Sequence, residues 1–436
     1  MTRFLLLLAW VALAILPALA QSETVKTPAP AFLEAKINEI WPEALVLFED
    51  LVRVNSYTHN PAGVNANAER IARAFEPMGF KARRIKCAQP NTGDHLVLDT
   101  GGNGPVIACV THLDTVFPPE EEERNRFHWQ PEGGRIYGPG TVDIKGGTVA
   151  IWMLMKTLST CVPEQFASVR WVVLGNAAEE ILSPDFAEVC REVLPPSTRA
   201  CLVFEADNEP ERGYGILRSR KGRGMFRIRV AGRGSHAGSQ YQTGANAIHQ
   251  LSRVIDRVMA LTDLSKEVTV NVGVVSGGVA VNRVPHEAEA SLEVRAYSPE
   301  VYREVRDAIL RMQGEGEIRA LDDGYPCKID VELVAETPPL PENPGTDKLI
   351  AVWKKAAAQC GLPLSVGRRG GLSDGNRLWQ HFPTLDALGP RGANDHSSER
   401  SPDGSKLPEY VDATSFVPKT LLNFFAVYSL ITEPAE

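Results

Sequence analysis

Apolar residues follow two different spacings along the chain. Residues 33–54 and 65–78 place them every three or four positions, which is typical of helices that pack one face on a sheet. Four short segments are instead continuous apolar runs, as in buried central strands: 105–110, 169–174, 200–204 and 384–388. Together these patterns predict an α/β domain with a mixed sheet.

The pattern changes between residues 220 and 335. Here strands are expected at 225–231, 268–275, 288–296 and 328–334, and helices at 245–261 and 299–312. This βαββαβ order predicts a small ferredoxin-like α+β domain inserted into the larger one. The proline-rich segment 338–344 would return the chain to the main domain, where 348–360 is expected to be helical. The predicted division is a main domain formed by residues 33–219 and 336–436, with the inserted domain at 220–335.

The first 20 residues resemble a secretory signal peptide. Arg3 precedes an apolar run over 4–15, and Ala18-Leu19-Ala20 has the small residues of a cleavage site. A transmembrane anchor is the alternative, but the run is shorter than the roughly 20 residues that a span needs. We therefore expect an exported protein, periplasmic or secreted, cut after Ala20 and without a membrane span in its mature form.

Length, charge and cysteine content narrow the picture further. The chain has 436 residues, which favours two domains. Its formal net charge is −8, and loss of Arg3 makes the mature chain −9, so nucleic acid is not an expected partner. Seven cysteines show no CxxC spacing. Cys109 and Cys201 lie in apolar runs and are expected to be buried thiols, whereas disulfides among the others cannot be assigned.

Polar side chains of metal-ligand type follow each of the four apolar runs. Because ligands of open α/β sheets bind at the carboxyl ends of strands, we expect these side chains to meet. A further carboxylate lies in the glycine-rich segment 137–147, before a predicted buried helix. The candidate ligands are His112, Asp143, Glu180, Glu205 and His396.

This set contains nitrogen and oxygen donors without sulfur, which suits zinc and, less selectively, cobalt or manganese. One carboxylate can bridge two ions, so five ligands can serve a two-metal site. Asp114, two residues after His112, is expected to accept the other imidazole N–H. Of the adjacent Glu179 and Glu180, one can bind metal while the other serves as general base.

These residues lie in motifs that resemble those of the M20 metallopeptidases, in particular the glutamate carboxypeptidase and acetylornithine deacetylase-like branch. The resemblance covers nearly the whole mature chain. Its motifs are Thr111-His-Leu-Asp-Thr-Val116, Gly138-Pro-Gly-Thr-Val-Asp-Ile-Lys-Gly-Gly147, Glu179-Glu180, Glu205, Gly232-Arg-Gly-Ser-His-Ala-Gly238, Asn282-Arg-Val-Pro285, Gly370-Gly-Leu-Ser-Asp374 and His396-Ser397.

The resemblance implies a zinc-peptidase-like fold and two Zn²⁺ per chain, with Co²⁺ or Mn²⁺ as possible substitutes. Asp143 would bridge the ions, with His112 and Glu205 on one and Glu180 and His396 on the other. Glu179 would be the base, and the Asp143-Ile144 peptide is expected to be cis. The inserted domain would form a homodimer or act as a lid.

The resemblance also implies roles around the substrate. His236 would stabilise the oxyanion of the reaction, across a dimer in many relatives. Arg295 and Asn282 would bind the substrate, and Arg295 would bind an α-carboxylate through two parallel hydrogen bonds. The pocket would be lined by Gly370, Gly371 and Ser373.

The predicted activity is hydrolysis of an amide bond next to a free carboxylate, in a small peptide or an N-acyl amino acid. An N-acyl-amino-acid deacylase or a di- or tripeptidase with the same centre is the alternative within enzymes. A non-catalytic binding protein on this scaffold, including a periplasmic solute-binding protein, is the alternative outside them. The chain departs from the family after its acidic pair, where Ile181-Leu-Ser183 replaces a usual Gly-Ser, and in a long 401–408 loop.

Overall fold

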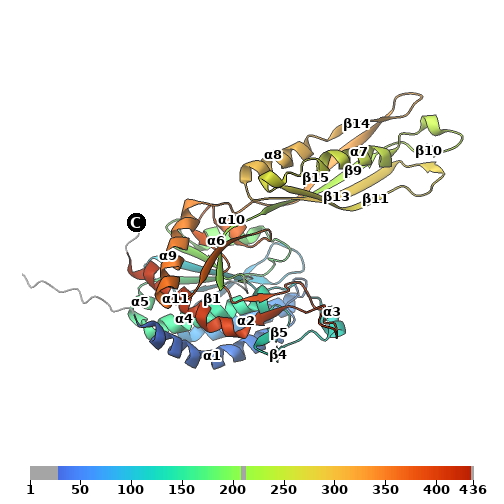
Figure 1. Cartoon of the computed structure of the whole chain (residues 1–436). Coiled ribbons are helices and arrows are strands. Elements are labelled where there is room, and N and C mark those ends of the chain that lie inside the picture. Colours follow the sequence, from blue (N-terminus) through green and yellow to red (C-terminus); the bar gives the residue numbers. More distant parts are fainter. Residues whose placement is uncertain (1–27, 208–212, 434–436) are drawn as a thin grey trace, which may run out of the picture.

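The computed structural model describes residues 28–207 and 213–433. The predicted signal peptide lies outside these ranges. Within them, no helix combines the length and the apolar character needed to cross a membrane. The predicted fold class is confirmed: an α/β domain carries a smaller, elongated domain that projects from it (Figure 1).

The larger domain is built on a six-stranded mixed sheet. Strands β6, β3, β7 and β17 run parallel, and β1 and β2 continue the sheet as an antiparallel pair. In spatial order the strands are β1 (Lys81–Lys86), β2 (Asp94–Asp99), β6 (Arg170–Asn176), β3 (Val106–His112), β7 (Ala200–Val203) and β17 (Thr384–Leu385). The last of these is shorter than the five-residue run predicted from the sequence.

Helices cover both faces of this sheet. Side chains of β3 alternate between two cores, because successive residues of a strand point to opposite faces. Ile107 and Cys109 join one core, and Ala108 and Val110 join the other. The first core is formed with α1 (Pro30–Val52), α2 (Pro61–Phe75), α4 (Gly146–Cys161), α9 (Pro344–Cys360) and α11 (Phe416–Thr432), the second with α6 (Asp185–Val193) and α10 (Gly375–Leu378).

Smaller elements complete the larger domain. Helices α3 (Pro119–Asn125) and α5 (Pro163–Ala167) are short. A second sheet has the order β18 (Gly392–Ala393), β19 (Tyr410–Asp412), β5 (Arg135–Tyr137) and β4 (Gln130–Glu132). A parallel pair joins β8 (Tyr214–Arg220) to β16 (Leu364–Arg369).

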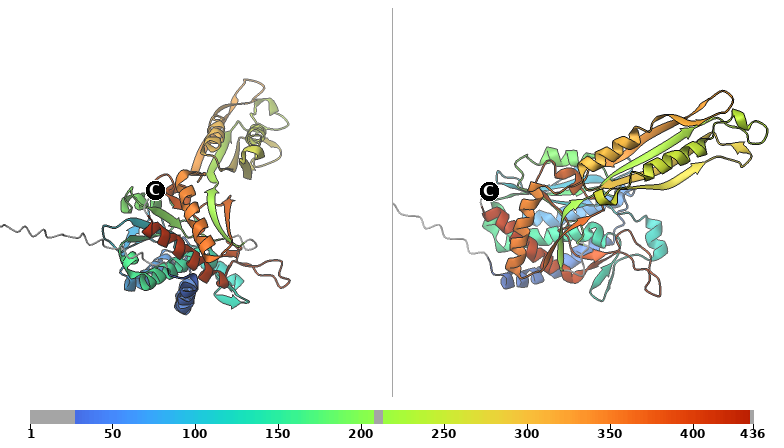
Figure 2. Two further views of the ribbon diagram at one scale, coloured as in Figure 1. Left: turned by 60° about the vertical axis from the view of Figure 1, so that its left-hand side comes forward. Right: turned by 45° about the horizontal axis from the view of Figure 1, so that its top comes forward.

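The inserted domain has its own core on a five-stranded antiparallel sheet. Helices α7 (Ala247–Met259) and α8 (Pro299–Leu310) cover one face (Figure 2). The strand order is β11 (Thr269–Gly277), β13 (Glu287–Ala296), β9 (Gly222–Ala231), β15 (Pro326–Thr337) and β14 (Gly314–Arg319). Beside it, β10 (Ser235–His236) pairs with β12 (Arg283–Val284).

Strand β14 was not predicted, so the βαββαβ expectation was one strand short. Its sequence, Gly314-Glu-Gly-Glu-Ile-Arg319, has no alternation of large apolar side chains and contains two glycines, which lower strand propensity. It forms only because β15 offers it a free edge, where it pairs with an irregular register.

Candidate active site

Asp143 lies between two histidines, one beside each of its carboxylate oxygens. His112 Nε2 is 2.9 Å from Oδ1, and His396 Nε2 is 3.3 Å from Oδ2. Glu205 Oε1 is 4.0 Å from His112 Nε2, and Glu180 Oε2 is 3.2 Å from His396 Nε2. The five predicted ligands therefore form two groups that share Asp143.

The sheet topology explains why residues far apart in sequence meet here. His112 is the last residue of β3, the acidic pair follows β6, and Glu205 follows β7. These strands are parallel neighbours, so their carboxyl ends lie at one edge of the sheet. His396 comes from the loop between β18 and β19, where its backbone has a φ of 64°.

Close packing fixes the backbone around Asp143. The Asp143-Ile144 peptide is cis, as the family resemblance implied. Glu409 Oε1 accepts hydrogen bonds from Val142 N at 2.8 Å and from Asp143 N at 3.1 Å. At Gly147, an added Cβ would lie 2.1 Å from the Phe204 carbonyl oxygen, so only glycine lets α4 begin this close to β7.

The carboxylates of the site are crowded and buried. Burial raises the pKa of Glu179 and Glu205 well above the usual glutamate range, and raises that of Glu180 to about 7. The charge of Asp143 adds to the shift at Glu180 and Glu205. Hydrogen bonds to Asp143 and Glu180 raise the pKa of His396 to about 11. The cluster thus favours positive charge between its acidic groups.

These residues fit metal ions. His112, Asp143 and Glu180 each offer a ligand atom, all within 4.8 Å of one another. Glu180 Oε1 is buried and lacks a hydrogen-bond partner in the described part of the chain. His112 Nδ1 lies 3.0 Å from the Asp114 carbonyl oxygen, a contact that directs Nε2 toward the carboxylates. Imidazole nitrogens and carboxylate oxygens are the donors that zinc accepts.

Asp114 lies beside His112, as the prediction requires, and also contacts the acidic pair. Its carboxylate Oδ1 is 3.5 Å from His112 Nδ1, so the backbone carbonyl is the nearer partner of the imidazole. The carboxylate also accepts hydrogen bonds from Thr58 Oγ1 at 2.7 Å, Glu179 N at 3.1 Å and Glu180 N at 3.3 Å. Asp114 therefore holds the backbone of the acidic pair against β3.

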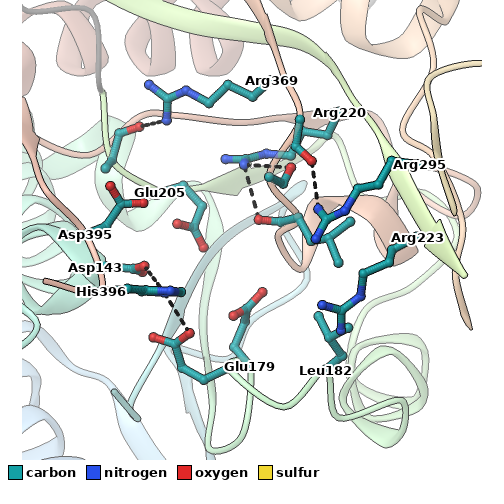
Figure 3. Close-up of a pocket in the computed structure, with 15 residues that line it drawn as sticks. Asp143, Glu179, Leu182, Glu205, Arg220, Arg223, Arg295, Arg369, Asp395 and His396 are labelled. Carbon is teal, nitrogen blue, oxygen red and sulfur yellow. Dashed lines mark hydrogen bonds and ion pairs between the residues drawn. The ribbon is translucent and has the colours of Figure 1, made fainter. Parts of the chain in front are cut away.

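A cavity of about 420 Å³ opens beside the ligands. Figure 3 shows Glu179 directed into it, between the ligand cluster and a wall of arginines. Gly370 and Gly371 line it as predicted, and so does Arg295, which donates to the Gly370 carbonyl oxygen at 2.9 Å and forms an ion pair with Glu293.

Three predicted site residues lie elsewhere. Ser373 is buried and donates to Asp386 Oδ2 at 2.5 Å, so its hydroxyl supports the loop and does not line the pocket. His236 and Asn282 lie at the end of the inserted domain that is remote from the larger domain (Figure 1). His236 Nδ1 accepts there from Gly238 N and Ser239 N. A single chain does not bring either residue to the cavity.

Several residues of the site were missed in the sequence. Glu409, which accepts a hydrogen bond from Asp143 N, directly follows the long 401–408 loop, and no motif in the sequence indicates its role. Arg223 of β9 lines the cavity. Several arginines lie close together in this part of the sequence, and the sequence does not indicate which of them faces the cavity. His95 is a buried structural residue, and its Nδ1 accepts a hydrogen bond from Ala177 N in the segment that carries the acidic pair, a contact that no local sequence pattern indicates.

Comparisons with known proteins agree with this arrangement. Residues 218–314 match the M20 peptidase dimerisation domain. Carboxypeptidase G2 from a Pseudomonas species is 26% identical over 387 residues, which cover 87% of each chain. A succinyl-diaminopimelate desuccinylase from a Bradyrhizobium species is 25% identical over 366 residues, covering 79% of this chain and 90% of the relative.

Solved structures share the fold. The aminopeptidase PepT of Bacillus cereus matches with a TM-score of 0.68 and 20% identity, over 89% of this chain and 98% of that one. The M20 family metallo-carboxypeptidase Sso-CP2 of Sulfolobus solfataricus matches with a TM-score of 0.63 and 15% identity, over 89% and 99%. The predicted relationship is confirmed: this chain is a relative of the M20 metallopeptidases, with their fold and their dimerisation domain.

Proposed function

We propose that this chain is a di-zinc hydrolase that cleaves an amide bond next to a free carboxylate of its substrate. The supporting observation is the pair of ligand groups that share Asp143 beside a cavity. His112, Asp143 and Glu205 would hold one ion, and Asp143, Glu180 and His396 the other. When bound, the ions would polarise the amide carbonyl and make water more acidic.

Glu179 is suited to move the proton. Its carboxyl group faces the cavity, and its backbone N–H is fixed by Asp114. Burial raises its pKa well above the usual range, which makes it a better proton acceptor than an exposed glutamate. Glu179 would take a proton from the attacking water and then give it to the leaving amine.

Arg295 would hold the substrate carboxylate. Its guanidinium lies at the cavity wall and already binds oxygen acceptors, the Gly370 carbonyl and Glu293. A carboxylate could be bound by two of its parallel N–H groups. His236 of a second copy would supply the donor to the developing oxyanion, because a single chain leaves this histidine at the far end of the inserted domain.

Two relatives, named carboxypeptidase G2 and metallo-carboxypeptidase, favour a substrate with a free carboxylate. Others, named desuccinylase and aminopeptidase, keep an N-acyl-amino-acid deacylase or a small peptidase as the second candidate. A panel of N-acyl amino acids, acylglutamates and dipeptides, assayed with zinc-loaded protein, separates these activities.

The variant Glu179→Gln tests the proposed mechanism. Loss of a general base lowers kcat by about 10²- to 10⁴-fold, whereas the five ligands remain. We expect two zinc ions per chain, by elemental analysis, in both the variant and the parent protein. Glu192→Gln, on the exposed side of α6, is the matched control and should keep full activity. An active, zinc-loaded Glu179→Gln protein would contradict the assignment.

Removal of the metal tests the proposed cofactor. A chelator should abolish turnover and lower the unfolding temperature, because bound ions stabilise the folded state by about 2.7 kcal/mol at 100 times Kd. Added zinc should restore both. A non-catalytic binding protein would instead bind ligands of the panel by calorimetry and turn over none, with or without zinc.

We also propose that the protein is exported. The support is the pattern of Arg3, the apolar run over 4–15 and Ala18-Leu19-Ala20. Amino-terminal sequencing of protein recovered from outside the cytoplasm should begin at Gln21. Recovery of intact chain from the cytoplasm alone would refute export.

A further inference from the structure

Four arginines line the cavity, and one of them has no partner. Arg220 is bound to Asp386 through two hydrogen bonds, of 2.7 and 2.9 Å. Arg295 is bound to Glu293 and to the Gly370 carbonyl, and Arg369 donates to the Ala206 carbonyl at 2.8 Å. The guanidinium of Arg223 makes neither a hydrogen bond nor an ion pair with any residue in the described ranges, although the residue is partly buried.

The neighbours of Arg223 on its strand show that this is unusual. Strand β9 presents Arg223, Arg227 and Arg229 on the face that the helices leave open. Arg227 pairs with Glu332 at 3.2 Å, and Arg229 pairs with Glu289 at 2.8 Å. Carboxylates therefore neutralise this face of β9 everywhere except at the end that meets the cavity.

The residue directly opposite Arg223 is another arginine. In the β13–β9 register, Arg295 is the cross-strand partner of Arg223. Like charges in this position destabilise a sheet, and the ion pair that Glu293 forms is with Arg295. Burial and the charge of Arg295 lower the pKa of Arg223, and they outweigh the opposing charges of Glu293 and Glu179. Figure 3 shows both guanidinium groups on the cavity wall, with Arg223 between Arg295 and Leu182.

We propose that Arg223 is a substrate-binding residue that selects substrates with a second carboxylate. This rests on the proposed function, in which Arg295 holds the first carboxylate. A guanidinium binds a carboxylate through two parallel hydrogen bonds, and a ligand with two negative charges would offset the repulsion between the two arginines. The substrate class is therefore a dicarboxylate, whose second acid group lies either in the amino acid released or in the acyl group.

Binding can be measured without catalysis, in the zinc-loaded Glu179→Gln protein by calorimetry. The ligands are N-acetyl-L-glutamate and its isostere N-acetyl-L-glutamine, which differ only in the second carboxylate. For the acyl side, N-succinyl-L-alanine and its succinamic acid amide form the matching pair. We expect the dicarboxylate of at least one pair to bind about 10- to 100-fold more tightly, and Arg223→Gln to bring that ratio close to one.

Variants on the same strand control this experiment. Arg229→Gln removes a guanidinium whose partner is Glu289, away from the cavity, and should keep the ratio. Arg223→Lys keeps the positive charge but loses the two parallel N–H groups of the guanidinium, and it should give an intermediate ratio of the two affinities. Arg223→Gln should unfold at the same or a higher temperature than the parent, because it removes the repulsion with Arg295.

The outcomes separate this proposal from the proposed function. Equal affinity for both members of both pairs, in protein with Arg223 intact, would overturn the role of Arg223. A ratio that falls equally in Arg229→Gln would also overturn it. If Glu179-containing protein turns over none of these substrates but the binding ratio depends on Arg223, the dicarboxylate site stands and the proposed hydrolysis fails.

Discussion

Asp143 organises the site, but buried polar residues around it determine its geometry. Its two oxygens face different histidines, and its backbone N–H is held by Glu409. Asp114 holds the backbone of the acidic pair in a similar way, because its carboxylate accepts three hydrogen bonds, two of them from the backbone N–H groups of Glu179 and Glu180. The ligands are thus positioned by carboxylates that need not contact a metal themselves.

Asp114→Asn tests this positioning at the scale of one residue. An amide keeps one acceptor oxygen but turns an NH₂ group toward a backbone N–H of Glu179 or Glu180, so one buried donor loses its partner. We expect a loss of about 1–3 kcal/mol in the free energy of unfolding. Activity or zinc affinity should fall by about 10- to 100-fold.

Urea unfolding, kcat and zinc titration measure these effects. Asp330→Asn, at an exposed position of β15, is the control and should match the parent protein. Full activity and unchanged zinc affinity in Asp114→Asn would show that the hydrogen bonds to the acidic pair do not position it.

At the scale of elements, the segment between β6 and α6 carries the acidic pair, and hydrogen bonds fix it at both ends. Ala177 N donates to His95 Nδ1 at 3.1 Å, so His95 Nε2 carries the proton and donates to Asp185 Oδ2 at 3.1 Å. Asp185 also accepts from Ala88 N at 2.7 Å and from Ser183 Oγ. Because both nitrogens of His95 are engaged, this cluster braces the segment that holds Glu179 and Glu180.

Asp185→Asn should loosen this brace. Burial alone would raise the pKa of Asp185, but hydrogen bonds from Ser183, Ala88 and His95 outweigh it and lower the pKa. An acid with a depressed pKa stabilises the folded state above its unfolded pKa of about 3.9, and this stabilisation is lost as pH falls through the folded value. The variant should therefore be less stable at pH 7 and lose less stability on acidification.

Thermal unfolding between pH 7 and pH 3 measures the difference. The gap between parent and variant should be about 1–3 kcal/mol at pH 7 and should shrink toward pH 3. A gap that stays constant with pH would mean that the charge of Asp185 contributes nothing. Asp330→Asn again serves as the control, since its position is exposed.

The elements that could be predicted are those whose apolar pattern is set by burial. Strands β3, β6 and β7 are buried on both faces, so their runs and the ligands after them were visible in the sequence. Strand β14 pairs with β15, the next strand along the chain, but its polar sequence with two glycines hides it. The hydrogen bonds around His95 depend instead on partners distant in sequence, which no local pattern encodes. Arg223 was hidden for the same reason: only the register with β13 sets it opposite Arg295.

At the scale of the whole molecule, one chain contains an incomplete site if His236 acts in catalysis. The inserted domain projects away from the larger one and carries β10, which contains His236, near its tip (Figure 1). Among the residues that the structure describes, its outer strand β11 pairs with β13 alone, and Val274 and Val275 are exposed along it. An unpaired apolar edge is suited to pair with the same strand of a second copy. We therefore expect a homodimer in which each site receives His236 from the partner.

Mixed dimers test this directly. His236→Ala and Glu179→Gln chains should each be inactive alone, but a mixed dimer has one site with both residues intact. Random pairing makes half of the dimers mixed, each with one complete site of two, so co-expressed chains should recover about a quarter of the parent activity. Different affinity tags on the two chains confirm that mixed dimers form. Co-expressed Glu179→Gln and Glu180→Gln chains should recover nothing, because both defects lie in the same half of the site and no mixed dimer can hold a complete one. Mixed dimers of the first pair that remain inactive would show that His236 acts within its own chain, and a His236→Ala protein that is active alone would show that His236 does not act at all.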